Sequence, residues 1–354
     1  MLGRLDSPHV ARVAAAMAAR GHTVHVAGDG SGSALEGVAI HPAPARIRTP
    51  LAGPALHAAW VRTLVRNIRP DLVHAHFLTD FAAAAALARA RPLLATAWGS
   101  DVQRPTRRQA VLRRFALRGA TAITAPTPHL VERLAALGVT AKRTRRVGWG
   151  VDLSYFAPNT EARAAARRRL GVEGPVVLSP RALRPLYNPG LVLEAFERLR
   201  SELPDASLLL VDAASDRPGL PPSPEGVRVL GPVAHAEMAN LYRAADAVVS
   251  VPSLDGSPSS VWEAMASARP VVVSDLPWLE GMVEANREAL VVPLEPSAVA
   301  SALGRLLRDR GLAERIGAAG RALVERTQDE RLEMNRLSEL YEELALRRRP
   351  ASRR

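Results

Sequence analysis

The sequence contains no cysteine, a single lysine (Lys142) and few aromatic residues. Because cysteine is absent, disulfides and thiolate metal sites are excluded. No uninterrupted apolar run reaches the roughly 18 residues that a membrane-spanning helix needs, and the N-terminus lacks the basic-then-apolar pattern of a signal peptide. These absences lead us to expect a cytoplasmic protein.

Aromatic side chains make up 4% of the residues, and no basic stretch is interleaved with them. Proteins that bind single-stranded nucleic acid stack its bases on aromatic rings, so we expect no nucleic-acid partner. Arginine supplies nearly all of the positive charge, and the net charge is +12. This excess has two interpretations, which are GC-rich coding and a preference for anionic partners such as nucleotide phosphates or anionic lipid.

Short apolar runs alternate with helical patterns along the chain, and 47% of the residues are hydrophobic. The apolar runs predict strands at 23–27, 72–77, 92–97, 121–125, 176–179, 207–211, 227–230, 247–251, 271–274 and 289–292. Helices are predicted at 8–20, 51–68, 107–118, 129–137, 189–203, 235–244 and 296–309, with the final helices between 312 and 349. Strands apolar on both faces that alternate with helices indicate parallel sheets covered on each side, so the fold class is α/β.

The length suits about two domains at ~150 residues each. Between Pro158 and Gly174 the composition becomes charged and alanine-rich, and a fresh strand follows. We therefore predict a first domain at 1–150, a linker at 151–173, a second domain at 174–326 and a C-terminal segment at 327–354 with an arginine-rich tail. The proline- and glycine-rich loop 215–226 is expected at the surface. Because Pro8 already starts a helix, we expect the opening strand to be truncated and the true start to lie upstream of Met1.

Two carboxylates, Asp255 and Glu263, flank a turn that leads into a helix. Gly256, Ser257 and Pro258 form the turn, and Pro258 suits an early helical position. The N–H groups of the first helical turn can bind an anion. Asp255 can accept hydrogen bonds from sugar hydroxyls, and Glu263 can accept a pair from a ribose diol. The alternative is a capped amphipathic helix whose next residues simply enter the core.

Several segments in a fixed order resemble one enzyme family. They begin with Ser-Pro-His-Val-Ala-Arg at 7–12 and continue at 20–26, 69–77, 98–102, 150–156, 181–188, 255–263 and 274–277. This series is similar to that of the retaining glycosyltransferases of the GT-B fold, family 4 type (glycosyl transferases group 1). The resemblance covers nearly the whole chain.

The resemblance implies two Rossmann-like domains that face each other across a cleft, with the last helix returning to the first domain. The first domain would bind a glycan, lipid or small-molecule acceptor, and the second a nucleoside-diphosphate sugar, which is a substrate rather than a cofactor. Transfer would retain the anomeric configuration of the sugar. No residue is identified as a candidate covalent nucleophile. The chain lacks the Asp-x-Asp motif of metal-dependent transferases, so no metal is expected.

By the same resemblance, Arg181 and Asp255 are the catalytic candidates. The implied donor-binding residues are Arg181, Arg184, Gly256, Ser257, Ser259, Ser260 and Glu263. Family members place a lysine about six residues after the arginine, where this chain has Tyr187. Arg184 is the candidate substitute because a guanidinium binds phosphate well; otherwise it is one more surface arginine.

On the acceptor side the resemblance implies His76, Trp98 and Asp101. Trp98 occupies a position where many family members have a histidine. Asp101 binds an acceptor hydroxyl or caps the next helix, and the cap is favoured. His74 and His76 share one strand face, which suits a metal pair or, preferably, hydrogen-bonded histidines. Two rival functions stay open, which are a nucleotide-sugar epimerase on the same fold and a non-catalytic sugar-nucleotide-binding or scaffold subunit.

Arginines gather around the helix predicted at 107–118. They are interleaved with apolar side chains, and the set is Arg104, Arg107, Arg108, Val111, Leu112, Arg113, Arg114, Phe115, Leu117 and Arg118. A basic amphipathic helix can rest weakly on an anionic membrane, here the inner face, as a peripheral contact. The alternative, which we favour on sequence alone, is a solvated face over an ordinary core stripe.

Overall fold

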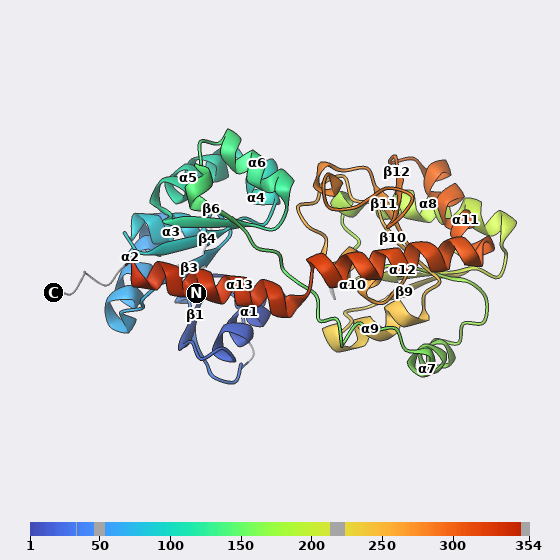
Figure 1. Ribbon diagram of the computed structural model, residues 1–354, viewed down its shortest axis with the longest axis horizontal. Helices are drawn as coiled ribbons and strands as arrows, with labels where there is room; N and C mark the ends of the chain where they lie inside the picture. The colour runs from blue at the N-terminus through green and yellow to red at the C-terminus, as the bar shows by residue number, and fades with distance from the viewer. Residues whose placement is uncertain (33, 46–53, 213–223, 348–354) are drawn as a thin grey trace. The chain divides into compact units, whose positions relative to one another are not determined.

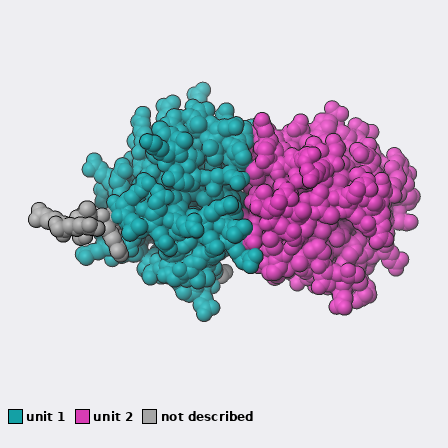
Figure 2. Space-filling model, viewed as in Figure 1, with its two compact units in different colours: residues 1–149, 331–354 teal, residues 150–330 magenta. Residues whose placement is uncertain are grey.

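The computed structural model describes residues 1–32, 34–45, 54–212 and 224–347 (Figure 1). The chain forms two compact units (Figure 2). Unit 1 is Met1–Trp149 together with the described residues from Arg331 onward, and unit 2 is Gly150–Glu330. Three predicted features lie wholly or partly outside the described residues, namely the start of the helix at 51–68, most of the loop 215–226 and the arginine-rich tail.

The strands of unit 1 all run parallel. They are β1 (Val24–Gly28), β2 (Val38–Pro42), β3 (Val73–His76), β4 (Leu93–Thr96), β5 (Ala122–Ala125) and β6 (Thr144–Arg146). One sheet has the order β3-β4-β5-β6, and β1 pairs with β2 beside it. Leu2 forms bridges to both Ala27 and Ala75, so the first residues of the chain connect β1 to β3. The central strands β3, β4 and β5 are buried throughout, as parallel strands covered on both faces require.

Among the described residues, three helices of unit 1 begin at side-chain caps. The helices of the unit are α1 (Pro8–Ala18), α2 (Pro54–Ile68), α3 (Phe81–Leu87), α4 (Ser100–Gln103), α5 (Arg107–Gly119), α6 (Pro128–Ala136) and the C-terminal α13 (Glu330–Leu346). The side chains of Ser7, Thr106 and Thr127 accept N–H groups at the starts of α1, α5 and α6. The apolar face of α13 supplies Leu337 and Leu344 to a core that also contains residues of α1 and β1.

Unit 2 is built around one six-stranded parallel sheet in the order β12-β11-β10-β7-β8-β9. Its strands are β7 (Val176–Ser179), β8 (Ser207–Val211), β9 (Val227–Leu230), β10 (Ala247–Ser250), β11 (Val271–Ser274) and β12 (Leu290–Val292). Its helices are α7 (Thr160–Leu170), α8 (Pro189–Glu202), α9 (His235–Ala244), α10 (Ser259–Ala266), α11 (Pro296–Arg308) and α12 (Arg310–Thr327).

Alternate residues of the central strands in unit 2 enter two different cores. Leu178 and Val248 belong to the core that includes residues of α9, α10 and α12. Val177 and Val249 belong to the core that includes residues of α8 and α11. Both faces of the sheet are therefore covered by helices, which is the doubly wound arrangement expected for a parallel sheet.

Residues 151–173, which composition suggests as a linker, lie within unit 2. Val151 and Phe156 enter its core. The alanine-rich stretch forms α7, because the Asn159 side chain caps its first turn and Gly171 ends it in a left-handed conformation. The density of charge in this stretch suggests a linker in the sequence, whereas in the folded chain two of its arginines, Arg163 and Arg167, form ion pairs with Asp246, which is distant in sequence.

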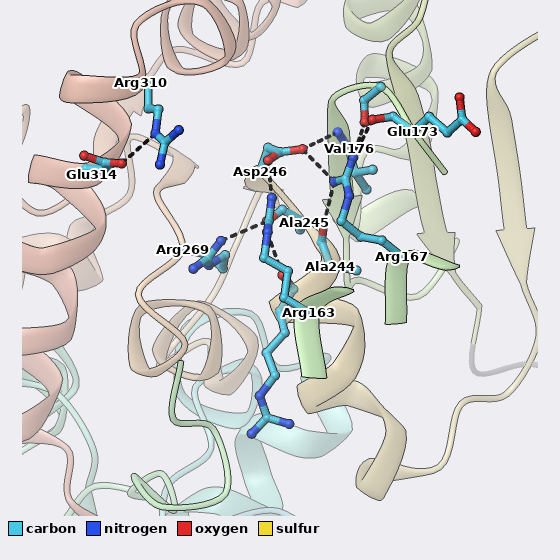
Figure 3. A network of polar contacts seen from close by, with 12 residues as sticks. Arg163, Arg167, Glu173, Val176, Ala244, Ala245, Asp246, Arg269, Arg310 and Glu314 are labelled. Atoms are coloured by element: carbon cyan, nitrogen blue, oxygen red, sulfur yellow. Dashed lines mark hydrogen bonds and ion pairs between the residues drawn. The ribbon is translucent and has the colours of Figure 1, made fainter. Parts of the chain in front are cut away.

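Asp246 holds α7 to the rest of unit 2 (Figure 3). Its carboxylate accepts hydrogen bonds from Arg163 at 2.5 Å and from Arg167 at 3.1 Å. The same two guanidinium groups donate to the carbonyls of Ala244 and Ala245 at the C-terminal end of α9. Cations at a helix C-terminus are favourable, so these arginines satisfy both the carboxylate and the last carbonyls of the helix.

Candidate functional site

The candidate site lies where two neighbouring strands of unit 2 end. Arg181 follows β7, and the loop to Asp255 and α10 follows β10, which pairs with β7. The carboxyl ends of parallel strands meet at one edge of a sheet, which is the usual place for a ligand site in such folds. Of the sequence-predicted site residues, Arg181, Asp255 and Ser260 are in direct contact at this edge.

Arg181 and Asp255 form an ion pair. The distance between Nη2 of Arg181 and Oδ2 of Asp255 is 2.6 Å, and Nη1 of Arg181 donates to Oγ of Ser260 at 3.1 Å. The two charged side chains are only 13% and 12% exposed. The guanidinium thus joins the loop after β10 to the first turn of α10.

The turn before α10 is organised by Asp255. Its Oδ1 accepts the N–H groups of Gly256 at 2.7 Å and Ser257 at 3.1 Å. Pro258 occupies the N-cap position, with φ −77° and ψ 99°, so the helix begins one residue after the proline rather than at it. The hydroxyl of Ser257 accepts a hydrogen bond from the Trp262 indole. The first N–H groups of α10 lack intrahelical acceptors, as at any helix start, and they lie beside this charged pair.

Tyr187 packs against Arg181. The central carbon of the guanidinium lies 4.2 Å from the centre of the Tyr187 ring. The tyrosine is held there because the next residue, Asn188, has a left-handed conformation and its side chain donates to Val251 and Ser253. At the position where the family resemblance predicts a lysine, this chain therefore carries a ring that contacts the arginine.

Arg184 precedes the short 3-10 turn that contains Tyr187. Its side chain is exposed and makes no hydrogen bond or ion pair with the residues that the structure describes. It is thus available to an anion, but no contact within the protein directs it toward Arg181.

Glu263 lies on α10, is 7% exposed, and faces α9. Its Oε2 accepts a hydrogen bond from the Tyr242 hydroxyl at 2.9 Å, and its Oε1 lies 3.5 Å from Nε2 of His235. Burial, followed by the charge of Glu263, raises the pKa of Tyr242 well above its usual value, so the phenol stays protonated and donates. Neither Tyr242 nor His235 is predicted from sequence, where α9 is indistinguishable from any amphipathic helix.

In unit 1, His76 ends β3 and is 1% exposed. Neither of its ring nitrogens has a hydrogen-bond partner among the described residues. Burial lowers its pKa to about 3, so the ring is neutral near pH 7. The neighbouring His74 bonds to Tyr341 at 2.5 Å and to Thr96 at 2.6 Å. Within the described residues no three His, Cys, Asp or Glu side chains are grouped so as to hold a metal.

Trp98 lies in the turn between β4 and α4, and Asp101 lies in the first turn of α4. The Trp98 ring stacks on Phe77, whose ring centre is 4.4 Å away. Asp101 is buried, and its oxygens accept the N–H groups of Trp98 and Gly99, both at 3.0 Å, and of Leu78 at 2.8 Å. Burial raises the pKa of Asp101, although these N–H groups act in the opposite direction. The carboxylate thus holds the turn that carries Trp98.

Two family models together match most of the chain. Residues 7–155 match Glycosyltransferase Family 4, and residues 162–323 match Glycosyl transferases group 1. The chain belongs to the GT-B glycosyltransferases of the family 4 type.

Curated relatives of this family member include two D-inositol 3-phosphate glycosyltransferases. That of Xylanimonas cellulosilytica is 35% identical over 224 residues, which are 58% of this chain and 53% of the relative. That of Kineococcus radiotolerans is 36% identical over 196 residues, which are 48% of this chain and 45% of the relative. The matched part of the chain thus spans about half the length of these relatives.

Solved structures confirm the predicted GT-B fold. Sucrose-phosphate synthase from Thermosynechococcus elongatus is similar with a TM-score of 0.81 at 19% identity, covering 96% of this chain and 93% of that one. HepE of Anabaena in complex with UDP and glucose is similar with a TM-score of 0.80 at 18% identity, covering 97% and 98%. At these identities the likeness concerns the fold.

Proposed function

We propose that this chain is a glycosyltransferase that transfers a sugar from a nucleoside-diphosphate sugar to a glycan, lipid or small-molecule acceptor. The observation that carries the proposal is the cluster of Arg181, Asp255 and Ser260 at the start of α10, with the buried Glu263 on the same helix. The curated relatives are named glycosyltransferases, and one structural neighbour holds UDP and glucose, which supports the choice of donor.

In the proposed donor complex the diphosphate is bound by Arg181 and by the N–H groups at the start of α10. A guanidinium has five N–H donors, so Arg181 can bind phosphate while it keeps Asp255 and Ser260. Asp255 accepts hydroxyls of the transferred sugar, and Glu263 accepts those of the ribose. The backbone and hydroxyls at Gly256, Ser257, Ser259 and Ser260 cover the sugar and diphosphate, and Arg184 is a second phosphate contact.

The proposed reaction proceeds with retention and without a metal or cofactor. The acceptor oxygen attacks the anomeric carbon on the face that the diphosphate leaves. The bond from that carbon to the phosphate oxygen breaks, and the leaving phosphate takes the acceptor proton. Arg181 and the helix N-terminus stabilise the charge that develops on the diphosphate.

On the acceptor side we propose His76 and Trp98 of unit 1. The neutral His76 can donate from one ring nitrogen and accept at the other, which suits an acceptor hydroxyl. Asp101 contributes by holding the turn that carries Trp98.

The experiment that tests the function begins with thermal shift against UDP, GDP, ADP and TDP and their sugars, because a saturating donor should stabilise the protein. Turnover is then measured with the donor that binds, using D-inositol 3-phosphate as the first acceptor because relatives carry it in their names. Release of nucleoside diphosphate that depends on acceptor supports transfer. An isomerised donor without acceptor indicates an epimerase, and binding without chemistry indicates a non-catalytic subunit.

We also propose that unit 1 contacts an anionic membrane surface as a peripheral protein on the inner face. A groove of about 770 Å³ between α2, α3 and α5 is lined mainly by apolar side chains with Arg62 and Arg108. On α5, Leu112 and Leu117 are buried as core residues, whereas Val111 and Phe115 are 52% and 43% exposed. The outward apolar side chains favour the membrane interpretation over a purely solvated face.

Charge supports the same surface. None of the helices α2, α3 and α5 contains an aspartate or glutamate. No helix among the described residues is long and apolar enough to cross a membrane, so any contact through these helices is at the surface. Cosedimentation should occur with vesicles that contain phosphatidylglycerol and should weaken at high salt.

A matched pair of triple variants tests this surface. Arg107→Gln, Arg108→Gln and Arg114→Gln remove three exposed charges from α5, and Arg168→Gln, Arg305→Gln and Arg315→Gln remove three from unit 2. Only the first set should abolish vesicle binding. Equal loss of vesicle binding in both triple variants would show that only the net charge of the protein matters. If the wild type did not bind vesicles at low salt, the membrane proposal would be wrong.

A further inference from the structure

Tyr242 and Glu263 are brought together by the packing of α9 against α10. Both side chains are buried, at 0% and 7% exposure. The Tyr242 ring is fixed by an edge-to-face contact with Phe156, with the ring centres 5.9 Å apart. The hydroxyl therefore has a defined position from which it donates to Oε2 of Glu263 at 2.9 Å.

This contact uses only part of the capacity of the carboxylate. An ionised carboxylate offers about four acceptor sites on its two oxygens. Oε2 accepts the hydrogen bond from Tyr242. Oε1 lies 3.5 Å from Nε2 of His235, whose side chain is 53% exposed. A buried carboxylate with one fixed oxygen has a defined orientation, and its other oxygen faces a partly exposed neighbour.

Protonation keeps the tyrosine in the donor role. Burial and the neighbouring carboxylate raise the pKa of Tyr242 well above its usual value, so it donates to Glu263 throughout the range in which proteins work. A phenol held in this way cannot act as a base, and its contact with Glu263 is an orienting one.

We infer that Tyr242 is a positioning residue that orients the Glu263 carboxylate for the two ribose hydroxyls of a nucleoside diphosphate, an inference that rests on the donor-binding function proposed above. Tyr242 itself does not touch the ligand. Its contribution is to fix one carboxylate oxygen, so that Glu263 meets the ribose diol without first losing the freedom to rotate.

The experiment measures binding by calorimetry with the full chain. The probes are UDP and 2′,3′-dideoxy-UDP, or the corresponding pair for GDP, ADP or TDP if one of these gives the larger thermal shift. Tyr242→Phe should weaken the binding of UDP by about tenfold, because a Glu263 carboxylate that is no longer oriented is expected to lose the equivalent of one charge-assisted hydrogen bond to the ribose. The dideoxy compound lacks the diol, so its affinity should stay within about twofold.

Two comparisons separate positioning from a general loss of structure. Tyr341→Phe removes another buried hydroxyl, which contacts His74 in unit 1, and should leave the affinity for UDP unchanged. In a Glu263→Gln background, Tyr242→Phe should add little further loss, because the two residues act as one unit. Thermal unfolding of each variant shows whether it folds.

The outcomes are distinguishable. If none of the four diphosphates binds the wild type, the donor-binding function fails and this inference fails with it. If the wild type binds UDP but Tyr242→Phe binds it equally well, or loses both probes equally, only the positioning role is overturned. If Tyr242→Phe does not fold, a crystal structure of the wild type with UDP decides, since a ribose that does not meet Glu263 contradicts the inference.

Discussion

Arg181 and Asp255 neutralise each other at the start of α10, with 2.6 Å between Nη2 and Oδ2 and little exposure of either side chain. The proposed function assigns them opposite partners, since Arg181 binds the diphosphate and Asp255 the sugar. The pair therefore predicts that removing each charge has a different effect on the two halves of the donor.

Arg181→Gln should weaken the binding of UDP and lower the rate of transfer. The fall in kcat/KM should correspond to about 2–4 kcal/mol of lost transition-state stabilisation, because the charge that Arg181 stabilises develops in the transition state. Asp255→Asn keeps an oxygen for the N–H groups of Gly256 and Ser257, so the turn should persist. It should lower transfer without weakening UDP, because a negative charge near the diphosphate is removed. Calorimetry with UDP and initial rates measure both. Equal loss of UDP affinity in the two variants would contradict the assignment.

Tyr187 should support Arg181 through its ring alone. Tyr187→Phe is expected to leave affinity for UDP unchanged, whereas Tyr187→Ala should cost about 0.5–1 kcal/mol because the face that holds the guanidinium is lost. Tyr187→Lys restores the cation that the family resemblance predicts and should tighten UDP. If phenylalanine and alanine behave alike, the ring contact with Arg181 has no role in binding.

Arg184 is tested separately because it lacks a contact that directs it to the site. If Arg184 is a second phosphate contact, Arg184→Ala should weaken the binding of UDP. It should leave the binding of uridine unaffected, since uridine has no phosphate. The control is Arg168→Ala, another exposed arginine of unit 2 on α7. Equal UDP affinity in Arg184→Ala and the control would show that Arg184 is a surface arginine.

The sequence predicts the fold well where strands are buried on both faces. The bounds of β7, β8 and β11 agree with the predicted ranges residue for residue, because each is a short, largely apolar run. The bounds of β9 also agree, although it is a partly exposed strand at the edge of the sheet. The strand β6 is not predicted, since it reads Thr-Arg-Arg and pairs at an edge through its backbone alone. The helix α3 is not predicted because five consecutive alanines carry no amphipathic period.

The candidate site is predictable only in part. The sequence places Arg181 and Asp255 after neighbouring strands, so a shared edge can be expected. Their direct ion pair depends on how the turn before α10 bends, and sequence patterns do not specify such a geometry. The contact of Tyr242 with Glu263 joins two helices, and it arises from tertiary packing. Likewise, the sequence pattern of α7 indicates solvent-exposed arginines, and the pairing of Arg163 and Arg167 with Asp246 is visible only in the fold.

His76 should make the stability of the protein depend on pH. Burial lowers its pKa from 6.5 to about 3, so between these values the unfolded chain binds a proton that the folded protein does not. The contribution of the neutral ring is fully present above pH 6.5 and is lost as the pH falls toward 3. The free energy of unfolding should therefore drop by about 1.4 kcal/mol per pH unit for this one proton.

Urea unfolding between pH 7.5 and pH 5 measures this slope, and His76→Asn should flatten it. The neighbouring His74, whose pKa burial also lowers, remains in that variant, so part of the slope should persist. An unchanged slope in His76→Asn would show that His76 does not carry the proposed linkage.

Asp246 lies at the amino ends of the central strands of the unit 2 sheet, whereas the candidate site lies at their carboxyl ends. It precedes β10, and its Oδ2 accepts the N–H of Val176, the first residue of β7, at 2.8 Å. Figure 3 shows Arg163 and Arg167 converging on it, and Arg310 paired with Glu314 some way off on α12. The first set is half-buried and the second pair is exposed, at 91% and 65%.

Asp246→Asn should therefore lower the free energy of unfolding by about 1–3 kcal/mol, because two half-buried guanidinium groups lose their counter-charge. Glu314→Gln breaks an ion pair of the same chemistry in solvent and should change stability little. Both variants should bind UDP like the wild type, since neither residue lies at the strand ends that carry Arg181 and Asp255. Urea unfolding and calorimetry measure the two properties. If Asp246→Asn lost affinity for UDP without losing stability, the proposal that the donor binds only at the carboxyl ends of the strands, away from Asp246, would be wrong.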